Sequence, residues 1–260
     1  MVTEYSRWFQ KGPHPGDIIT LDRPGPSSWK ILEKLSEYDY QVNIEENEES
    51  GRRSLASAKY LCSDPKSRTR KALMRIYTRV PHGKTEMHDA ATRSQQVTTF
   101  EPPELIAYRD LTEKGSSETP RLLGYKTGKQ DGSGLVPGGF IIWLVWEIVP
   151  GLRLGDGNGA DAFWALESDE RQRVRVALVI DLAKLYEIRW LPCILGARSL
   201  VWHQEKQKLY FIAPFSRVDR PRRDITFGAD WMAHFDLVQP DPSMDESDPD
   251  WGKDTSNWVY

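Results

Sequence analysis

The segment 168–212 constrains the fold of this 260-residue chain more than any other part of its sequence. Residues 168–190 repeat apolar side chains at steps of three and four, which is the pattern of a helix with one buried face. A loop follows, and then two short apolar runs, residues 199–202 and 208–212. Short apolar runs separated by polar residues are typical of strands. We therefore expect a long helix, a loop and a β-hairpin, in that order.

Three earlier segments carry a resemblance to a known family. They are residues 72–76 (Ala-Leu-Met-Arg-Ile), 101–108 (Glu-Pro-Pro-Glu-Leu-Ile-Ala-Tyr) and 143–156 (Trp-Leu-Val-Trp-Glu-Ile-Val-Pro-Gly-Leu-Arg-Leu-Gly-Asp). With them, residues 31–237 resemble small fungal proteins that have a protein-kinase-like fold. The resemblance implies that the first segment is the strand of the phosphate-binding lysine, the second the start of the glutamate-bearing helix, and the third the interlobe hinge.

The fold that this resemblance implies is α+β and two-lobed. We expect a small N-lobe with an antiparallel sheet of five strands and one helix, and a reduced, mainly helical C-lobe. The expected divisions are an N-terminal extension (residues 1–30), the N-lobe (31–142), the hinge and reduced C-lobe (143–238) and an acidic C-terminal tail (239–260). The glycine-rich stretch 126–139 is expected to be a loop before the hinge strand.

The residues that a kinase needs for phosphotransfer are missing. Kinases carry a His-x-Asp and an asparagine in the loop after the long helix, and Asp-Phe-Gly after the hairpin. Here no acidic residue lies between Ile188 and Trp202, and no asparagine lies between Gly159 and Ser256. Residues 212–215 (Ile-Ala-Pro-Phe) stand where the magnesium-binding aspartate belongs. We expect degenerate catalytic motifs, no kinase activity and no cofactor.

Two further positions depart from the kinase pattern. Arg75 stands in place of the lysine, and its forked guanidinium either pairs with Glu104 or is a surface charge. Residues 43–51, in place of the glycine-rich loop, contain four glutamates and one glycine. They would repel a triphosphate, or they form a solvated, disordered surface loop. Both interpretations of the glutamates disfavour ordinary ATP use.

Composition indicates a globular protein in the cytoplasm. The chain is 39% hydrophobic and 28% charged, and it contains no apolar run of membrane-spanning length and no signal-peptide pattern at its N-terminus. No membrane association is expected. Cys62 and Cys193 lie far apart, which favours reduced thiols over a disulfide. The two cysteines and five scattered histidines have no metal-ligand spacing, so no metal site is expected.

Basic residues concentrate in one part of the chain. Residues 51–93 hold eleven basic and three acidic residues, although the whole chain has a formal charge of −3. Basic residues interspersed with tyrosines suit the binding of an RNA backbone. The candidate RNA-binding residues are Arg52, Arg53, Lys66, Arg68, Arg70, Lys71 and Arg79. The alternative is that strand alternation points charges such as Arg70, Arg75 and Arg79 at water on one exposed sheet face.

Several polar residues of the second half are candidates for chemistry. Asp181 falls on or beside the apolar stripe of the long helix, so it needs a partner. That partner is a substrate cation or an arginine of the other lobe, or else Arg198 or a loop hydroxyl. Glu147 at the hinge is open to the same two interpretations. Ser199 and His203 alternate onto one strand face as a conceivable nucleophile and base, with no orienting acid.

Two functions of different class remain open. Fungal enzymes that make arginine-containing cyclic dipeptides from aminoacyl-tRNA are compatible with this chain in size and in their need for a polyanion-binding surface. That resemblance implies tRNA as partner, an activated ester in place of ATP, catalysis by Glu104, Asp181, Ser199 and His203, and ligand binding by Arg75 and Glu147. The alternative is a non-catalytic pseudokinase that binds a ligand or a protein partner.

Overall fold

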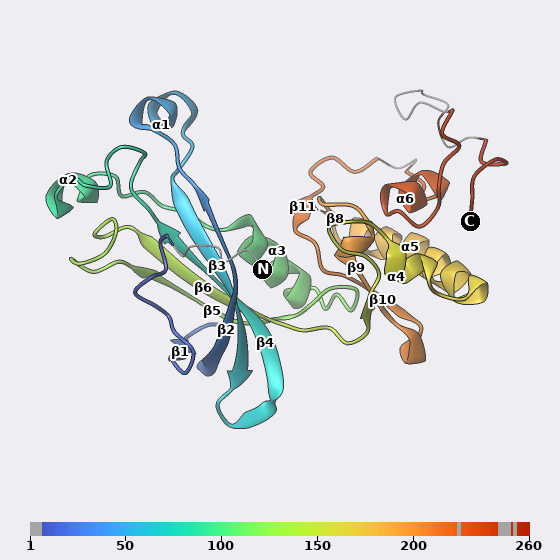
Figure 1. The fold of residues 1–260 in the computed structure, drawn as a ribbon, viewed down its shortest axis with the longest axis horizontal. Coiled ribbons are helices and arrows are strands. Elements are labelled where there is room, and N and C mark those ends of the chain that lie inside the picture. The colour runs from blue at the N-terminus through green and yellow to red at the C-terminus, as the bar shows by residue number, and fades with distance from the viewer. Residues whose placement is uncertain (1–6, 223–224, 244–250, 252–253) are drawn as a thin grey trace. The chain divides into compact units, whose positions relative to one another are not determined.

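The chain folds into two compact units, each with its own antiparallel sheets (Figure 1). This computed structural model describes residues 7–222, 225–243, 251 and 254–260, apart from the side chain of Arg68. The first unit is Met1–Leu105 with Leu122–Ile148, and the second is Ile106–Arg121 with Val149–Tyr260. The predicted α+β class is confirmed.

The first unit is built on a six-stranded sheet in which all neighbouring strands are antiparallel. Its strands are β1 (Ile18–Leu21), β2 (Ser27–Tyr40), β3 (Leu55–Asp64), β4 (Ser67–Arg79), β5 (Leu122–Lys129) and β6 (Phe140–Glu147), in the order β1-β2-β3-β4-β6-β5. Five strands were expected, and β1 is the sixth. The prediction of a loop over residues 126–139 is wrong at its start, because β5 continues to Lys129.

One face of this sheet packs a hydrophobic core. Alternate residues of each strand point to that face, since the side-chain period of a strand is two. The core includes Trp29, Ile31, Ala58, Tyr60, Cys62, Met74, Ile76 and Val145, all nearly inaccessible to water. Burial raises the pKa of the Cys62 thiol to about 12, so this thiol stays protonated. Cys193 is exposed, and both cysteines are free.

The glutamate-rich segment is a helix, which corrects the prediction of a loop. Helix α1 (Ile44–Ser50) begins with a capping box, in which the Asn43 side chain accepts from Glu46 N and the Glu46 carboxylate accepts from Asn43 N. Glu45 and Glu46 lie in the first turn, where negative charge stabilises the helix dipole. No residue of α1 is buried, so local capping accounts for this helix better than packing does.

Two more helices begin in the first unit. Helix α2 (Ala90–Ser94) is capped by Asp89, and α3 (Pro103–Glu113) carries Glu104 in its first turn, as the sequence predicts. Helices α1 and α2 lie at one end of the sheet, and the β3–β4 turn lies at the other (Figure 1).

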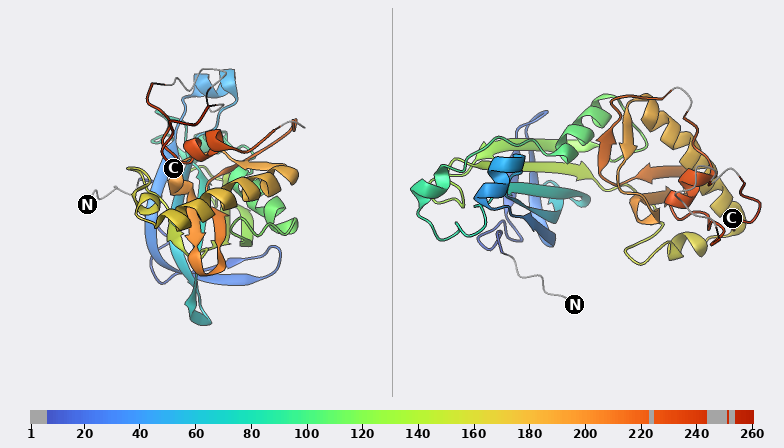
Figure 2. Two further views of the ribbon diagram at one scale, coloured as in Figure 1. Left: turned by 90° about the vertical axis from the view of Figure 1, so that its right-hand side faces the viewer. Right: turned by 90° about the horizontal axis from the view of Figure 1, so that it is seen from above.

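The second unit is centred on the predicted long helix, α5 (Ser168–Glu187). The predicted β-hairpin follows it as β9 (Leu200–His203) and β10 (Lys208–Phe211), and α5 packs on β10 (Figure 2). The other elements are β7 (Leu152–Arg153), α4 (Asp161–Trp164), β8 (Trp190–Pro192), η1 (Ala197–Ser199), η2 (Gln204–Lys206), β11 (Phe215–Arg217) and α6 (Ala229–His234). Strand β7 pairs with β9, and β8 pairs with β11.

Leu178, Leu182 and Leu185 form the buried stripe of α5, in agreement with the predicted helical period.

Gly151, just before β7, has φ +129°, and a Cβ there would lie 2.4 Å from the carbonyl oxygen of Trp202. Only glycine, which has no Cβ, allows the backbone at position 151 to lie this close to Trp202.

Within the described residues, no helix combines the length and apolar character needed to cross a bilayer. Asp245, Glu246, Asp248 and Asp250 of the predicted acidic tail lie outside the described residues.

Candidate functional site

The polar face of the first unit's sheet holds the ion pair that the sequence suggests. Arg75 Nη1 donates to both carboxylate oxygens of Glu104, at 3.1 and 3.0 Å, and the Tyr77 hydroxyl donates to Glu104 Oε2 at 3.0 Å. Arg75 and Tyr77 lie two residues apart on β4, so both point to the helix side of the sheet. The Glu104 carboxylate is therefore engaged by two donors, which leaves it poorly suited to accept a substrate proton.

The neighbouring strand adds a second cation. The sheet register pairs Lys59 of β3 with Arg75 of β4. Lys59 Nζ lies 5.7 Å, and Arg75 Cζ 5.8 Å, from the ring centroid of Trp146 on β6, which is within the range of cation–π attraction. Burial and the Glu104 charge raise the pKa of Tyr77, so its hydroxyl remains a donor. Lys59 and Tyr77 belong to the basic, tyrosine-containing segment that the sequence analysis identifies, but their place beside Glu104 and Trp146 was not predicted.

These side chains line a cavity of about 340 Å³, here called the sheet-face cavity. Its lining residues are Ser36, Tyr38, Leu55, Ser57, Lys59, Arg75 and Tyr77. Two phenol rings provide stacking surface, and two cations and two serine hydroxyls provide hydrogen bonds to an anionic or polar ligand. A cavity with this combination suits a single nucleotide or a ligand of similar chemistry. Glu147, paired with Ala72 in the register, is half-buried and does not line this cavity.

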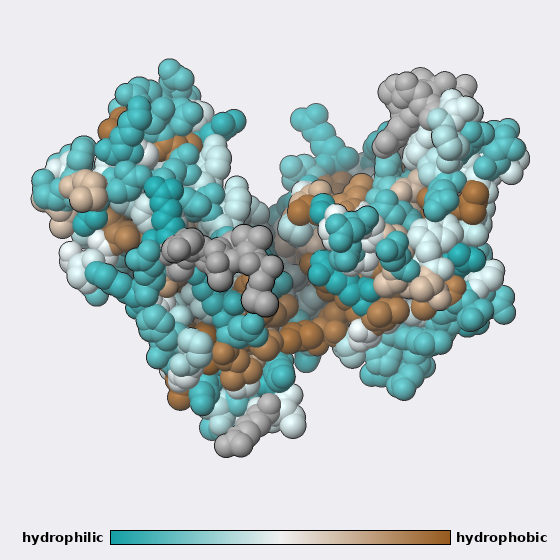
Figure 3. All heavy atoms as spheres, in the orientation of Figure 1, coloured by the Kyte–Doolittle hydropathy of each residue, from teal (hydrophilic) through white to brown (hydrophobic). Residues whose placement is uncertain are grey.

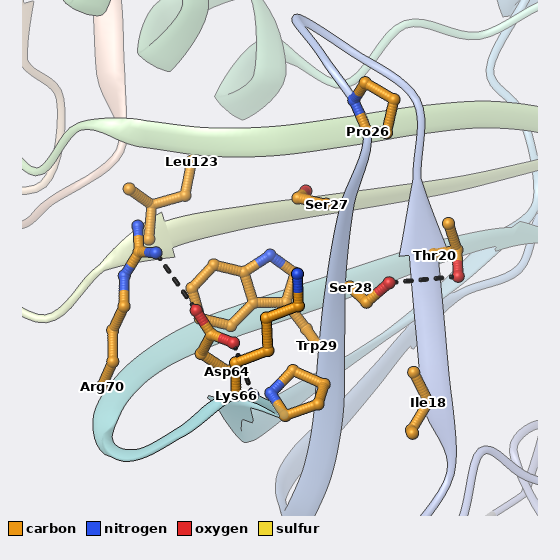
Figure 4. Close-up of a pocket in the computed structure, with 11 residues that line it drawn as sticks. Ile18, Thr20, Pro26, Ser27, Ser28, Trp29, Asp64, Lys66, Arg70 and Leu123 are labelled. Atoms are coloured by element: carbon orange, nitrogen blue, oxygen red, sulfur yellow. Dashed lines mark hydrogen bonds and ion pairs between the residues drawn. The ribbon is translucent and has the colours of Figure 1, made fainter.

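Two of the predicted RNA-binding residues line a second cavity, of about 580 Å³, beside the β3–β4 turn (Figure 4). In this turn cavity the Arg70 guanidinium lies 5.3 Å from the Trp29 ring centroid and donates to Asp64 at 3.2 Å. Lys66 lies on the same turn and is exposed. The turn cavity therefore combines exposed positive charge with an aromatic ring.

The other predicted RNA-binding residues have different environments. Arg52 and Arg53 are exposed near α1, at the end of the unit where hydrophilic side chains cover most of the face shown in Figure 3. Lys71 is exposed on β4, and the side chain of Arg68 lies outside the described residues. The predicted set is thus distributed over both ends of the sheet.

Arg79 is not on the surface, which corrects its prediction as an RNA contact and as part of an exposed charged face. It is 1% exposed, because residues 82–98 fold over the end of β4. Its guanidinium donates to Ser54 O at 2.6 Å, to Gln96 O at 3.0 Å and to His82 Nε2 at 3.0 Å. The alternation of side chains along β4 predicts which face of the sheet Arg79 lies on. It does not predict that another segment covers that side chain.

In the second unit, Asp181 is part of a small charged cluster. Lys184 Nζ donates to Asp181 Oδ1 at 2.7 Å and to Glu118 Oε1 at 3.4 Å. The predicted partners, Arg198 or a loop hydroxyl, are wrong; the partner lies three residues further along the same helix, a spacing that the sequence already contained. Glu118 and Lys184 were not predicted.

Burial is the main cause that raises the pKa of Asp181, and the Glu118 charge adds to it. Burial also acts on Glu118, but hydrogen bonds from Ser117 and the charge of Lys184 hold its pKa below the ordinary value. Burial thus favours the protonated form of Asp181, whereas the donors around Glu118 favour its ionised form.

Ser199 and His203 do not form a nucleophile and base pair. Ser199 is 3% exposed, and its hydroxyl donates to Ile194 O at 2.9 Å. His203 Nδ1 accepts from Lys206 N at 3.3 Å, as the cap of a short 3₁₀ helix. Both side chains are used in local turns, so nothing in their geometry favours nucleophilic catalysis.

We expect Glu104→Ala to lower the free energy of unfolding by about 1–3 kcal/mol, because Arg75 and Tyr77 would lose their shared acceptor in a half-buried environment. Chemical denaturation followed by tryptophan fluorescence measures this change. Glu113→Ala, an exposed position at the end of the same helix, is the matched control. Equal stability of the two variants would contradict a structural role for the ion pair.

Comparison with known proteins adds a likeness at the level of the fold. No protein-family model and no curated protein sequence matches the chain. The structure is similar to that of the Cydia pomonella granulovirus kinase PK-1, with a TM-score of 0.41, 14% identity, and coverage of 79% of this chain and 60% of the kinase. It is also similar to that of vaccinia related kinase 3, with a TM-score of 0.37, 15% identity, and coverage of 79% and 53%. The chain thus spans a little more than half of each kinase structure.

Among the described residues, no group of three or more potential ligands is placed to hold a metal ion.

Proposed function

We propose that this chain binds aminoacyl-tRNA and joins two aminoacyl groups into an arginine-containing cyclic dipeptide, without ATP. The observation that carries the proposal is a set of exposed cations on the first unit. Within the described part of the chain, Arg52, Arg53, Lys66 and Lys71 have no carboxylate partner. Cations that no carboxylate neutralises are available to displace counterions from an RNA backbone.

The sheet-face cavity is the proposed site for one unpaired nucleotide of the tRNA. Such a nucleotide offers a base that stacks on Tyr38 or Tyr77 and a phosphate for Lys59. The volume of about 340 Å³ suits one nucleotide rather than a duplex. Arg75, which Glu104 orients, provides a fixed planar donor where a kinase-like fold would have a lysine.

The chemistry begins from an ester that is already activated, so neither a metal-bound phosphate nor a phosphotransfer base is needed. Asp181 is proposed to take a proton from the α-ammonium group of one aminoacyl ester. The freed amine attacks the ester carbonyl of the other aminoacyl group; an amide C–N bond forms, the C–O bond to ribose breaks, and that hydroxyl leaves with a proton. The remaining amine then attacks the remaining ester in the same way, which closes the six-membered ring and releases the second tRNA.

The Glu118 carboxylate, beside the Asp181 base, is the proposed receptor for the arginine side chain of the substrate. A guanidinium binds carboxylates through two parallel hydrogen bonds, which a lysine ammonium does not reproduce. Lys184, with a side chain 52% exposed, holds this position in the free protein. Displacement of an exposed lysine costs less than opening a buried pair.

Incubation of the purified protein with arginyl-tRNA and a second aminoacyl-tRNA, with ATP omitted, tests the proposal. Mass spectrometry is expected to show a cyclic dipeptide that contains arginine, and Asp181→Asn is expected to reduce its rate at least about 100-fold, the usual scale of a lost general base. Asp169→Asn, an exposed position on the same helix, should react at the wild-type rate. Absence of any product with the folded wild-type protein would sink the proposal.

A second candidate is a ligand-binding protein of kinase-like fold that performs no transfer. The observation that favours it is that the first unit by itself contains the whole lining of the sheet-face cavity and the Arg75–Glu104 pair. Such a protein would bind a nucleotide and leave aminoacyl esters intact. Calorimetric titration with adenosine monophosphate, set beside the transfer assay, distinguishes the two functions.

A further inference from the structure

The buried guanidinium of Arg79 lines a cavity that contains one of the proposed tRNA-binding cations, Arg53, and none of the residues proposed for the transfer chemistry. This α1–α2 cavity has a volume of about 620 Å³ and lies at the end of the first unit's sheet. Its lining includes Ile44, Glu48, Arg53, Arg79, His82 and Val97. Most lining residues have hydrogen-bonding side chains, and they come from α1, the turn before β3, the end of β4 and the segment 82–98, which contains α2.

The charge of Arg79 has no counter-charge among the residues that the structure describes. All three of its hydrogen-bond partners are neutral: two backbone carbonyls and the imidazole of His82. A buried charge without a partner of opposite sign is costly, even when its N–H groups are bonded. A guanidinium has five N–H groups, and these bonds use three of them.

His82 is fixed in its neutral form by the same contacts. Its Nε2 must accept from Arg79 Nη2, because a guanidinium can only donate. Its Nδ1 lies 3.3 Å from Val42 O and therefore carries the proton. Burial and the Arg79 charge lower the pKa of His82, so the imidazole adds no charge at neutral pH. His82 therefore positions the Arg79 guanidinium but does not neutralise its positive charge.

A second guanidinium strengthens the positive field in this cavity. Burial lowers the pKa of Arg79 to about 10, and the charge of Arg53 contributes to this shift. Arg79 is still charged at neutral pH, so two like charges share one cavity. Glu48 is the single carboxylate of the lining, and within the described residues it forms no ion pair with either arginine.

We propose that the α1–α2 cavity is an oxyanion site for a phosphoryl group, bound between Arg79 and Arg53. A phosphoryl group presents several acceptor oxygens in different directions, which matches donors from the two guanidinium groups. The cavity is larger than a phosphate ion alone, and Ile44 and Val97 provide apolar wall for the rest of the ligand. This site goes beyond the proposed transfer reaction, since it needs neither an aminoacyl ester nor Asp181.

Calorimetric titration with inorganic phosphate tests the site, and two adjacent arginines give a matched pair of variants. Arg53 lines the cavity, whereas its neighbour Arg52 bonds to the Tyr40 hydroxyl and does not. Both substitutions with glutamine remove one exposed positive charge. We expect Arg53→Gln to weaken phosphate binding at least tenfold and Arg52→Gln to leave it within about twofold, the tolerance expected for a charge that acts only through the screened field.

Arg79→Lys retains the positive charge but replaces the planar guanidinium and its several N–H donors with an ammonium group. We expect this variant to show no measurable phosphate binding, while its circular dichroism spectrum stays as in the wild type. Competition then identifies the source of the phosphoryl group. Displacement of phosphate by adenosine monophosphate indicates a phosphorylated small molecule, and displacement by a short RNA with hydroxyl ends indicates a phosphodiester; either result supports the site. No phosphate binding by the wild type, or equal losses in Arg53→Gln and Arg52→Gln, would overturn it, whatever the outcome of the transfer assay.

Discussion

The double substitution of Lys66 and Arg70 with glutamate is expected to weaken tRNA binding roughly 100-fold at low salt, because two cations of the turn cavity become anions. Each phosphate contact that a cation makes releases counterions, so the slope of the logarithm of affinity against the logarithm of salt concentration should fall by about 0.7–0.9 for each lost contact. Arg70 already donates to Asp64, which reduces its share of the effect. Filter binding with uncharged tRNA at several salt concentrations measures both quantities.

The control for this prediction reverses two exposed lysines outside the cavities. Lys11→Glu with Lys206→Glu changes the net charge by the same amount, and neither residue lines any of the cavities described above. If the turn cavity contacts RNA, the control variant should lose little affinity for tRNA, because its two charges act on the RNA only through a long-range field that salt screens. Equal losses in the two double variants would show that tRNA is attracted by net charge and not by this surface.

The second large effect concerns the core beneath the turn cavity. We expect Trp29→Ala to lower the free energy of unfolding of the first unit by about 3–5 kcal/mol, the usual cost of truncating a large aromatic side chain in a core. Trp29 is 2% exposed, packs in the main hydrophobic cluster and lies under the Arg70 guanidinium. Its indole nitrogen has no hydrogen-bond partner among the described residues, so little hydrogen bonding is lost with it. Hydrogen exchange of the β3 amides reports this stability for the first unit alone.

Tyr38→Ala is the matched control on the same strand. Its side chain is 63% exposed, so truncation removes little buried area, and a change within about 0.5 kcal/mol is expected. A loss for Trp29→Ala no larger than that for Tyr38→Ala would contradict the assignment of this face of the sheet as the core.

The elements with strong periodicity could be predicted from the sequence. The order of α5 and the β9–β10 hairpin follows from apolar spacing alone, whereas the strand that carries Arg75 was predicted from the resemblance. The Arg75–Glu104 pair was one of two alternatives, since Arg75 could also have been a surface charge; the structure shows the pair and adds Tyr77 as a third member. Local signals that were present in the sequence were missed twice: the Asn43 and Glu46 capping box of α1, and the Asp181 and Lys184 spacing on α5.

Other features depend on contacts that are distant in the sequence. The burial of Arg79 results from a segment that returns over the end of β4 and provides Gln96 O as an acceptor. Glu118 reaches Lys184 across 66 positions of sequence. No spacing rule for one strand or one helix contains such partners, and so the cavities of the first unit could not be assembled from the pattern of basic residues. The sequence could indicate which residues are charged but not which charges lie together.

Mass spectrometry of cells that express the chain and grow on isotope-labelled arginine tests most directly whether the chain forms a cyclic dipeptide. A cyclic dipeptide that carries the label is expected with the wild-type protein and with Asp169→Asn, and none is expected with Asp181→Asn or with the empty vector. A labelled product of equal amount in the Asp181→Asn cells, or no labelled product in cells that contain folded wild-type protein, would contradict the proposed function.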